Sequence, residues 1–96
     1  MKRRTAREKA LQALFQIDVS QTEPETAIEH VLEGEKSDAY LNKLVSGVLQ
    51  HKEIIDGEIK GFLEKWTLER LATVDRNLLR LSVFELLYLA EEVPAN

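Results

Sequence analysis

The most apolar part of the chain is the segment 74–90. From Leu78 onwards only three polar residues interrupt its hydrophobic run: Arg80, Ser82 and Glu85. Hydrophobic residues would cover nearly every side of a helix formed by this segment, which is typical of a helix buried on most sides. The run is shorter than the roughly 20 apolar residues that a membrane-spanning helix needs. It therefore predicts the central helix of a bundle, in which Arg80 and Glu85 must be paired or reach water.

Apolar residues also recur with helical spacing in the earlier parts of the chain. In the first segment, Ala10, Leu11, Leu14, Phe15 and Ile17 form a stripe that we expect to be buried. Because no strand-like alternation of useful length occurs, the pattern favours an all-α fold of about five helices. We expect these helices at residues 6–19, 23–33, 38–50, 53–65 and 74–90, with a break or a bend near residues 51–52 and a single turn within 67–72.

Polar residues mark the predicted helix ends. Thr5 with Glu8, and Thr22 with Glu25, match the capping box, in which the two side chains satisfy free backbone N–H groups at a helix start. Glycines at helical spacing suggest that helices approach one another closely. The other expected signals are N-caps at Ser37 and Thr73, a left-handed stop at Gly34, a helix stop at Pro94, and close contacts at Gly47, Gly57 and Gly61.

The first nine residues differ in charge from the rest of the chain. They carry five basic residues and one acidic residue, a net charge of +4, whereas the whole chain carries −4 and the remainder therefore −8. Arg3 and Arg4 precede the predicted cap and Arg7 lies in the first turn, where positive charge opposes the helix dipole. A helix start also offers free backbone N–H groups to a phosphate. The pattern favours an anionic partner met at one end, with a simple solvated terminus as the alternative.

The sequence contains no recognisable catalytic constellation. There is no cysteine, which excludes disulfides and thiolate metal sites. His30 and His51 lack the spacing of a metal site, and we interpret both as surface residues. Since no nucleophile elbow or glycine-rich phosphate loop occurs, we expect neither an enzyme nor a cofactor. Trp66 and Tyr88 could stack on bases, but packing at the core or its boundary is the favoured interpretation. The basic start is not a signal peptide, which favours a cytoplasmic protein.

Three stretches of the sequence form a specific combination: RRTAREKALQALFQID near the start, LVSGVLQHKEIIDGEIKGFL in the middle, and VDRNLLRLSVFELLYL near the end. Together they resemble the NusB family of bacterial transcription antitermination factors. The resemblance covers essentially the whole chain, residues 1–96. It implies an all-helical fold of two small bundles, which here would comprise residues 1–51 and 52–96.

The resemblance also implies a function without catalysis. NusB-like proteins bind the boxA element of ribosomal-operon transcripts as a heterodimer with NusE, a small-subunit ribosomal protein. The complex joins other Nus factors on RNA polymerase and suppresses premature termination. The arginine-rich start of the family matches this chain, which implies RNA contacts at Lys2, Arg3, Arg4 and Arg7.

The surface that faces NusE in the family draws on the region from the fourth predicted helix into the fifth. This implies partner contacts at Glu69, Asp75 and Arg76. Each has a structural alternative. Asp75 could simply complement the helix dipole, and Arg76 could pair with Glu69 or with a carboxylate across the bundle. Arg80 and Glu85 are assigned to structure, as paired polar groups on the central helix.

Family members continue beyond the VPxN segment with about two further helices, whereas this sequence stops at Asn96. Without those helices, apolar faces of the last helix are left uncovered, and we expect this chain to self-associate through them. Two other interpretations remain open. The chain could be the amino-terminal RNA-binding domain of a ribosomal RNA cytosine methyltransferase, or a structural helical adaptor with an incidental basic tail.

Overall fold

The computed structural model describes residues 1–63 and 67–90. These ranges contain α-helices and a single 3-10 turn, and no strand, so the prediction of an all-helical fold with five helices is confirmed. The predicted end of the fourth helix at Lys65, the packing of Trp66 and the stop at Pro94 lie outside the described residues. The elements are α1 (Arg3–Ser20), α2 (Pro24–Leu32), α3 (Ala39–Gln50), α4 (Lys52–Phe62), η1 (Leu68–Arg70) and α5 (Thr73–Tyr88).

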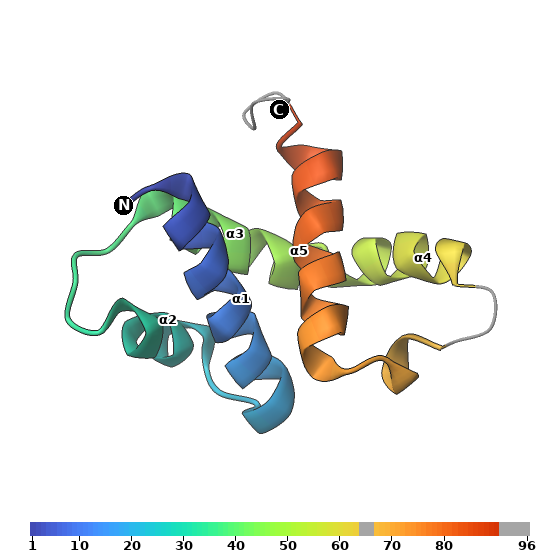
Figure 1. Cartoon of the computed structure of the whole chain (residues 1–96), viewed down its shortest axis with the longest axis horizontal. Helices are drawn as coiled ribbons and strands as arrows, with labels where there is room; N and C mark the ends of the chain where they lie inside the picture. Colours follow the sequence, from blue (N-terminus) through green and yellow to red (C-terminus); the bar gives the residue numbers. More distant parts are fainter. Residues whose placement is uncertain (64–66, 91–96) are drawn as a thin grey trace.

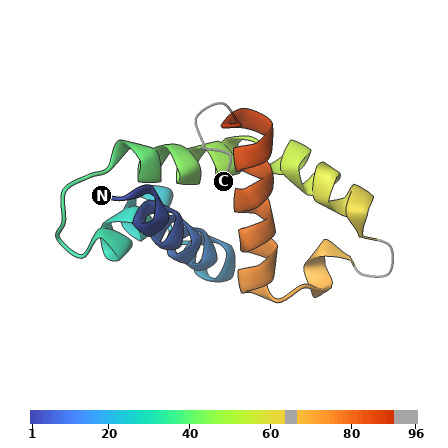
Figure 2. The ribbon, with the colours of Figure 1, turned by 45° about the horizontal axis from the view of Figure 1, so that its top comes forward.

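Helix α5 occupies the middle of the molecule. It lies between α1 and α4, and α3 crosses behind it (Figure 1), an arrangement that the tilted view also shows (Figure 2). All three of these helices contact α5, while α2 packs mainly on α1. Because α5 contacts helices on both sides of the predicted boundary at residues 51 and 52, it links the two predicted sub-bundles.

Only one side of α5 is buried. Leu81 and Phe84 face the core, where they join apolar side chains of the other helices. The opposite side exposes a row of large hydrophobic residues, and Leu86 is 73% exposed. The expectation that α5 leaves apolar faces uncovered is therefore confirmed for the described part of the chain, whereas burial on most sides was wrong. The exposed large hydrophobic residues of α5 are Leu78, Leu79, Leu86 and Leu87, together with Val74 and Tyr88 near the two ends of the helix.

Arg80 and Glu85, the two charged residues within the apolar run of α5, are paired, as the sequence required. Arg80 donates from Nε to Oδ1 of Asp56 on α4 (2.8 Å) and from Nη1 to Oδ2 of Asp18 on α1 (3.3 Å). Glu85 accepts from Arg7. Asp18 also accepts from Asn77 at 2.9 Å. These side chains connect α1, α4 and α5, so the polar groups of the central helix fix the positions of its neighbours.

The helix starts differ from the predicted caps. The amide of Ala6 donates to the carbonyl of Lys2 (2.9 Å), so α1 begins at Arg3 with Lys2 as its N-cap, and the Thr5 cap was wrong. At α3 the carboxylate of Asp38 accepts from the amide of Leu41 and replaces the predicted Ser37. The N-cap of α2 is likewise one residue later than predicted, Glu23 instead of Thr22, whereas that of α5 is one residue earlier, Ala72 instead of Thr73.

The predictions made for the glycine residues were confirmed at some positions and not at others. At Gly47 a Cβ atom would overlap the Phe84 ring, so α3 and α5 approach as closely as predicted. Among the described residues, none lies close to the position of a Cβ atom at Gly57 or Gly61, so the close contacts predicted there are not found in this part of the chain. Gly34 has a φ of +84° and follows the C-cap residue of α2, which agrees with a left-handed stop. The predicted break near residues 51–52 is confirmed by the boundary between α3 and α4.

Candidate nucleic-acid interface

The start of α1 presents positive charge to solvent. Lys2 is its N-cap, and Arg3 and Arg4 form the beginning of its first turn, which contains no acidic residue. All three residues are exposed, and the Arg4 side chain reaches 92% exposure. Its Nε lies 3.7 Å from Oε1 of Glu8, an exposed pair of the kind that contributes little to stability. The first-turn backbone N–H groups and these cations therefore face the same region of solvent, a suitable arrangement for binding phosphate.

Arg3 is oriented by an aromatic ring on another helix. Its guanidinium carbon lies 4.5 Å from the centroid of Tyr40, in the first turn of α3, which is a cation–π contact. Burial and the nearby charge of Glu85 raise the pKa of Tyr40, so its hydroxyl remains protonated. That hydroxyl donates to Oε2 of Glu85 at 3.4 Å. Arg3 is consequently held beside α3 instead of extending freely from the chain.

Arg7 occupies a different environment from Arg4. Its Nε donates to both carboxylate oxygens of Glu85 on α5, at 2.8 and 2.9 Å. The Arg7 side chain is 40% exposed and that of Glu85 is 11% exposed. Both bonds are donated by Nε, and they fix the direction of the Arg7 guanidinium group relative to α5. The structure therefore gives Arg7 a structural bond in addition to its predicted contact with RNA.

The three predicted partner-contact residues differ in their exposure. Glu69 lies on η1 and Asp75 in the first turn of α5, and both are exposed. Arg76 instead donates from Nε and Nη2 to Oδ2 of Asp18, at 2.9 and 2.8 Å, and its side chain is only 16% exposed. Arg76 therefore makes the carboxylate contact across the bundle that the sequence offered as a structural alternative. Its partner is Asp18 and not Glu69.

A groove between α1 and α5 was not anticipated from the sequence. It has a volume of about 500 Å³ and is lined by Leu11, Gln12, Phe15, Gln16 and Val74. Phe15 is 38% exposed there, so its assignment to the buried stripe of α1 was wrong. The stripe of five residues was wider than the side of α1 that the other helices cover. That excess width is the sequence signal that could have indicated a surface for a partner.

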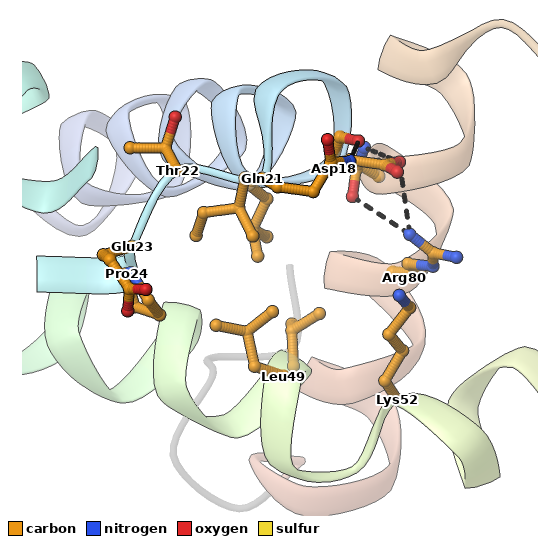
Figure 3. Close-up of a pocket in the computed structure, with 12 residues that line it drawn as sticks. Asp18, Gln21, Thr22, Glu23, Pro24, Leu49, Lys52 and Arg80 are labelled. Carbon is orange, nitrogen blue, oxygen red and sulfur yellow. Dashed lines mark hydrogen bonds and ion pairs between the residues drawn. The ribbon is translucent and has the colours of Figure 1, made fainter. Parts of the chain in front are cut away.

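A second hollow, of about 350 Å³, lies where α1 ends and α2 begins, and it also reaches α3 and α5. Figure 3 shows Asp18 and Arg80 joined on one wall, with Lys52 below them. Burial alone would raise the pKa of Asp18, but hydrogen bonds from Arg76 and Asn77 and the nearby arginine charges lower it below its ordinary value. Asp18 and Arg80 on this wall are thus bound to each other, and we interpret the hollow as part of the structural network.

The described residues give no evidence of a metal site or of a membrane-spanning helix. These residues include no group of three or more acidic or histidine side chains that could hold a metal ion. No helix among them is long and apolar enough to cross a membrane. The fold and its basic helix end define a small all-helical protein suited to binding an anionic partner at one end.

The comparisons with known proteins identify the family. The model of the NusB family matches residues 4–96. The transcription antitermination protein NusB of Bacillus velezensis is 58% identical over 96 residues, which are all of this chain and 73% of the relative. The corresponding protein of Bacillus subtilis strain 168 is 55% identical, again over all of this chain and over 72% of the relative. The chain belongs to the NusB family of transcription antitermination proteins.

Solved structures agree with this assignment. A chain in a structure of the antitermination factors NusB and NusE in complex with double-stranded RNA matches with a TM-score of 0.80 and 35% identity, over 92% of this chain and 68% of that one. A chain in a crystal structure of a plectonemic RNA supercoil matches with a TM-score of 0.83 and 36% identity, over 91% and 67% respectively. These relatives belong to a non-catalytic family, which favours the factor over a methyltransferase domain.

Proposed function

We propose that this chain is an RNA-binding antitermination factor that recognises boxA RNA of ribosomal-operon transcripts together with NusE. In this role it joins the antitermination complex on RNA polymerase with other Nus factors, and it acts in the cytoplasm. The observation that carries the proposal is the exposed group of cations at the start of α1 on a NusB fold. The related solved structure that contains NusB, NusE and RNA supports it.

The RNA contacts are assigned to Lys2, Arg3, Arg4 and Arg7. Guanidinium groups bind phosphates through two parallel hydrogen bonds and also stack on unpaired bases. Arg4 extends into solvent, while Arg3 and Arg7 are held by Tyr40 and Glu85. Side chains that are already ordered lose less conformational entropy on binding. The group therefore combines one adaptable cation with two oriented ones.

The NusE contact is assigned to the groove between α1 and α5. Phe15 and Val74 supply exposed apolar surface in it. Asp75 follows Val74 directly, and Glu69 is exposed on the preceding turn. An apolar centre with acidic groups beside it suits a protein partner that brings apolar and basic side chains. Arg76 supports this surface indirectly, because it fixes the start of α5 to Asp18 on α1.

The RNA assignment can be tested by titrating the chain and NusE with boxA RNA and with a scrambled RNA. Changing Arg3 and Arg4 together to Glu is expected to lower boxA affinity by about tenfold or more, since phosphate contacts dominate affinity. The matched control is Lys60→Glu, an exposed charge reversal on α4, with little expected effect. Equal affinities for the unaltered chain and the Arg3/Arg4 variant would refute the assignment.

Self-association of this chain is proposed through the exposed face of α5. Leu86 and Leu87 are 73% and 48% exposed, and burying them against a second copy removes apolar surface from water. Sedimentation velocity should show a concentration-dependent increase in mass for this chain. Leu86→Lys should abolish the increase, whereas Ile54→Lys on α4, also at an exposed apolar residue, should not. A monomer at every concentration would contradict this proposal.

A further inference from the structure

Three aromatic rings pack together where the end of α3 meets the last turn of α5. The centroids of His51 and Tyr88 lie 4.1 Å apart with an interplanar angle of 19°, and Phe84 lies 5.4 Å from Tyr88. Phe84 is buried against Gly47, but Tyr88 remains 40% exposed and His51 is half-buried. The cluster therefore extends from the core to the surface and leaves ring surface in contact with solvent.

These rings form one wall of a pocket of about 320 Å³. This volume lies at the lower end of the range for small-ligand sites, about 300–1,000 Å³. The pocket is also lined by Lys43, Ser46 and Gln50, which contribute a cation and groups that can form hydrogen bonds. Flat aromatic surface beside a cation and an amide is the combination with which proteins bind unpaired nucleotides.

The pocket adjoins the basic start of α1. Tyr40, Lys43 and Gly47 on α3 and His51, its C-cap residue, follow one another at intervals of three or four residues, so they lie along one face of the helix. Tyr40 at one end of this face holds Arg3, and His51 at the other end stacks on Tyr88. Cationic and aromatic groups thus alternate along the face over roughly 16 Å, from the rise of about 1.5 Å per residue.

Helix α5 joins the same two sites from its own side. Glu85, which binds Arg7 and Tyr40, lies three residues before Tyr88. Consecutive turns of α5 therefore carry the group that orients the arginines and the ring that lines the pocket. An RNA strand held by phosphate contacts at the start of α1 would pass the pocket as it continues along α3.

We propose that this pocket, built from His51, Tyr88 and Lys43, is a subsite for one unpaired base of single-stranded RNA. The base stacks on the exposed ring surface, and Lys43 contributes positive charge beside the strand. The inference rests on the proposed RNA-binding function and deepens it. It also changes the interpretation of Tyr88 from boundary packing to ligand contact. The stacking is expected to tolerate different bases, because every base has an aromatic face.

The test pairs a change in the protein with a change in the RNA. Tyr88→Leu removes the ring but keeps apolar volume at a partly exposed helix position, and Tyr88→Phe keeps the ring as the matched control. The RNA probes are single-stranded boxA oligonucleotides in which one nucleotide at a time is replaced by an abasic site. Affinities for each protein and RNA are measured with NusE present, and thermal unfolding of each variant checks that it is folded.

Tyr88→Leu is expected to weaken binding of the intact RNA by about tenfold, while Tyr88→Phe binds as the unaltered chain does. Removing the base at one position of the RNA should lower its affinity for the unaltered chain by a similar factor. The same abasic RNA should bind the Tyr88→Leu variant almost as tightly as intact RNA does, because that variant has already lost the contact with this base. His51→Ala should reduce the effect at that same position. A merely structural role of Tyr88 would give equal losses for every abasic RNA.

The inference is overturned if Tyr88→Leu binds the intact RNA as tightly as the unaltered chain, or if its loss does not depend on the abasic position. The Arg3/Arg4 variant separates this failure from that of the proposed function. If that variant binds weakly while Tyr88→Leu binds normally, only the subsite is refuted. If the unaltered chain itself does not distinguish boxA RNA from scrambled RNA, the proposed function fails and the inference fails with it.

Discussion

Arginine has opposite surroundings in two regions of this molecule. In the interior of the bundle, Arg76 and Arg80 have side chains that are 16% and 8% exposed, and both donate to Asp18. At the start of α1, the side chain of Arg4 is 92% exposed, and its single ion contact within the described part of the chain is a long one with Glu8. The same guanidinium group therefore fixes helices in one place and faces solvent in the other. What distinguishes the two roles is the position of the nearest carboxylates in the folded chain.

Arg7 lies between these extremes and shows how the two regions are connected. Arg7 belongs to the basic segment at the start of the chain, yet its Nε donates to Glu85 on the central helix. Lys9 in the same segment donates to the carbonyl of Val31 at 2.7 Å. A basic run in the sequence is thus divided by the fold into residues that stabilise the bundle and residues that remain for a partner.

The largest expected effect is on stability, from removing the carboxylate shared by the interior arginines. Asp18→Ala removes the carboxylate that Arg76 binds and leaves Arg80 with Asp56 and a long hydrogen bond to Asn77. Breaking such a partly buried pair should lower the free energy of unfolding by about 3 kcal/mol. Chemical denaturation measures this change. Asp75→Ala, an exposed carboxylate on α5, is the matched control and should cost less than about 1 kcal/mol.

A smaller effect on the free energy of unfolding is expected when Arg7 is changed, and Arg4 provides the comparison. Arg7→Gln should lower the free energy of unfolding by about 1–2 kcal/mol, because the mostly buried Glu85 loses its charged partner. It should also weaken boxA binding. Arg4→Gln should weaken binding without a measurable change in stability, since its pair with Glu8 is exposed. Denaturation and RNA titration of both variants measure the two quantities. Equal stability of the two variants would contradict the structural role of Arg7.

The smallest expected effect concerns pH. The pKa of Asp18 is lower in the folded chain than its ordinary value of 3.8, so the folded state binds fewer protons at this group than the unfolded state does. The resulting stability is present above that ordinary value and is lost as the pH falls through the lower folded pKa. Unfolding of the chain and of Asp18→Asn should be compared from pH 7 down to about pH 2. A smaller decrease in the variant is expected, and identical decreases would argue against this linkage.

Much of the fold could be predicted from local patterns in the sequence. The helices, the break near residues 51–52 and the short turn before the last helix follow from hydrophobic spacing, which depends only on neighbouring residues. Arg80 and Glu85 were identified as paired because a charge on an apolar helix must have a partner. The positions of the N-caps were less certain, since Ser37 and Asp38 can both cap a helix and the aspartate does so here.

The sequence by itself determined the helices, the family and the concentration of positive charge at the start of the chain. Only the tertiary structure decided which charges remain exposed. Arg7 and Glu85 are 78 positions apart, and Arg76 and Asp18 are 58 apart. The exposure of Phe15 and the contact between His51 and Tyr88 likewise depend on how α1, α3 and α5 cross. Helix periodicity specifies which residues share a side of one helix, but packing of the helices determines which sides meet.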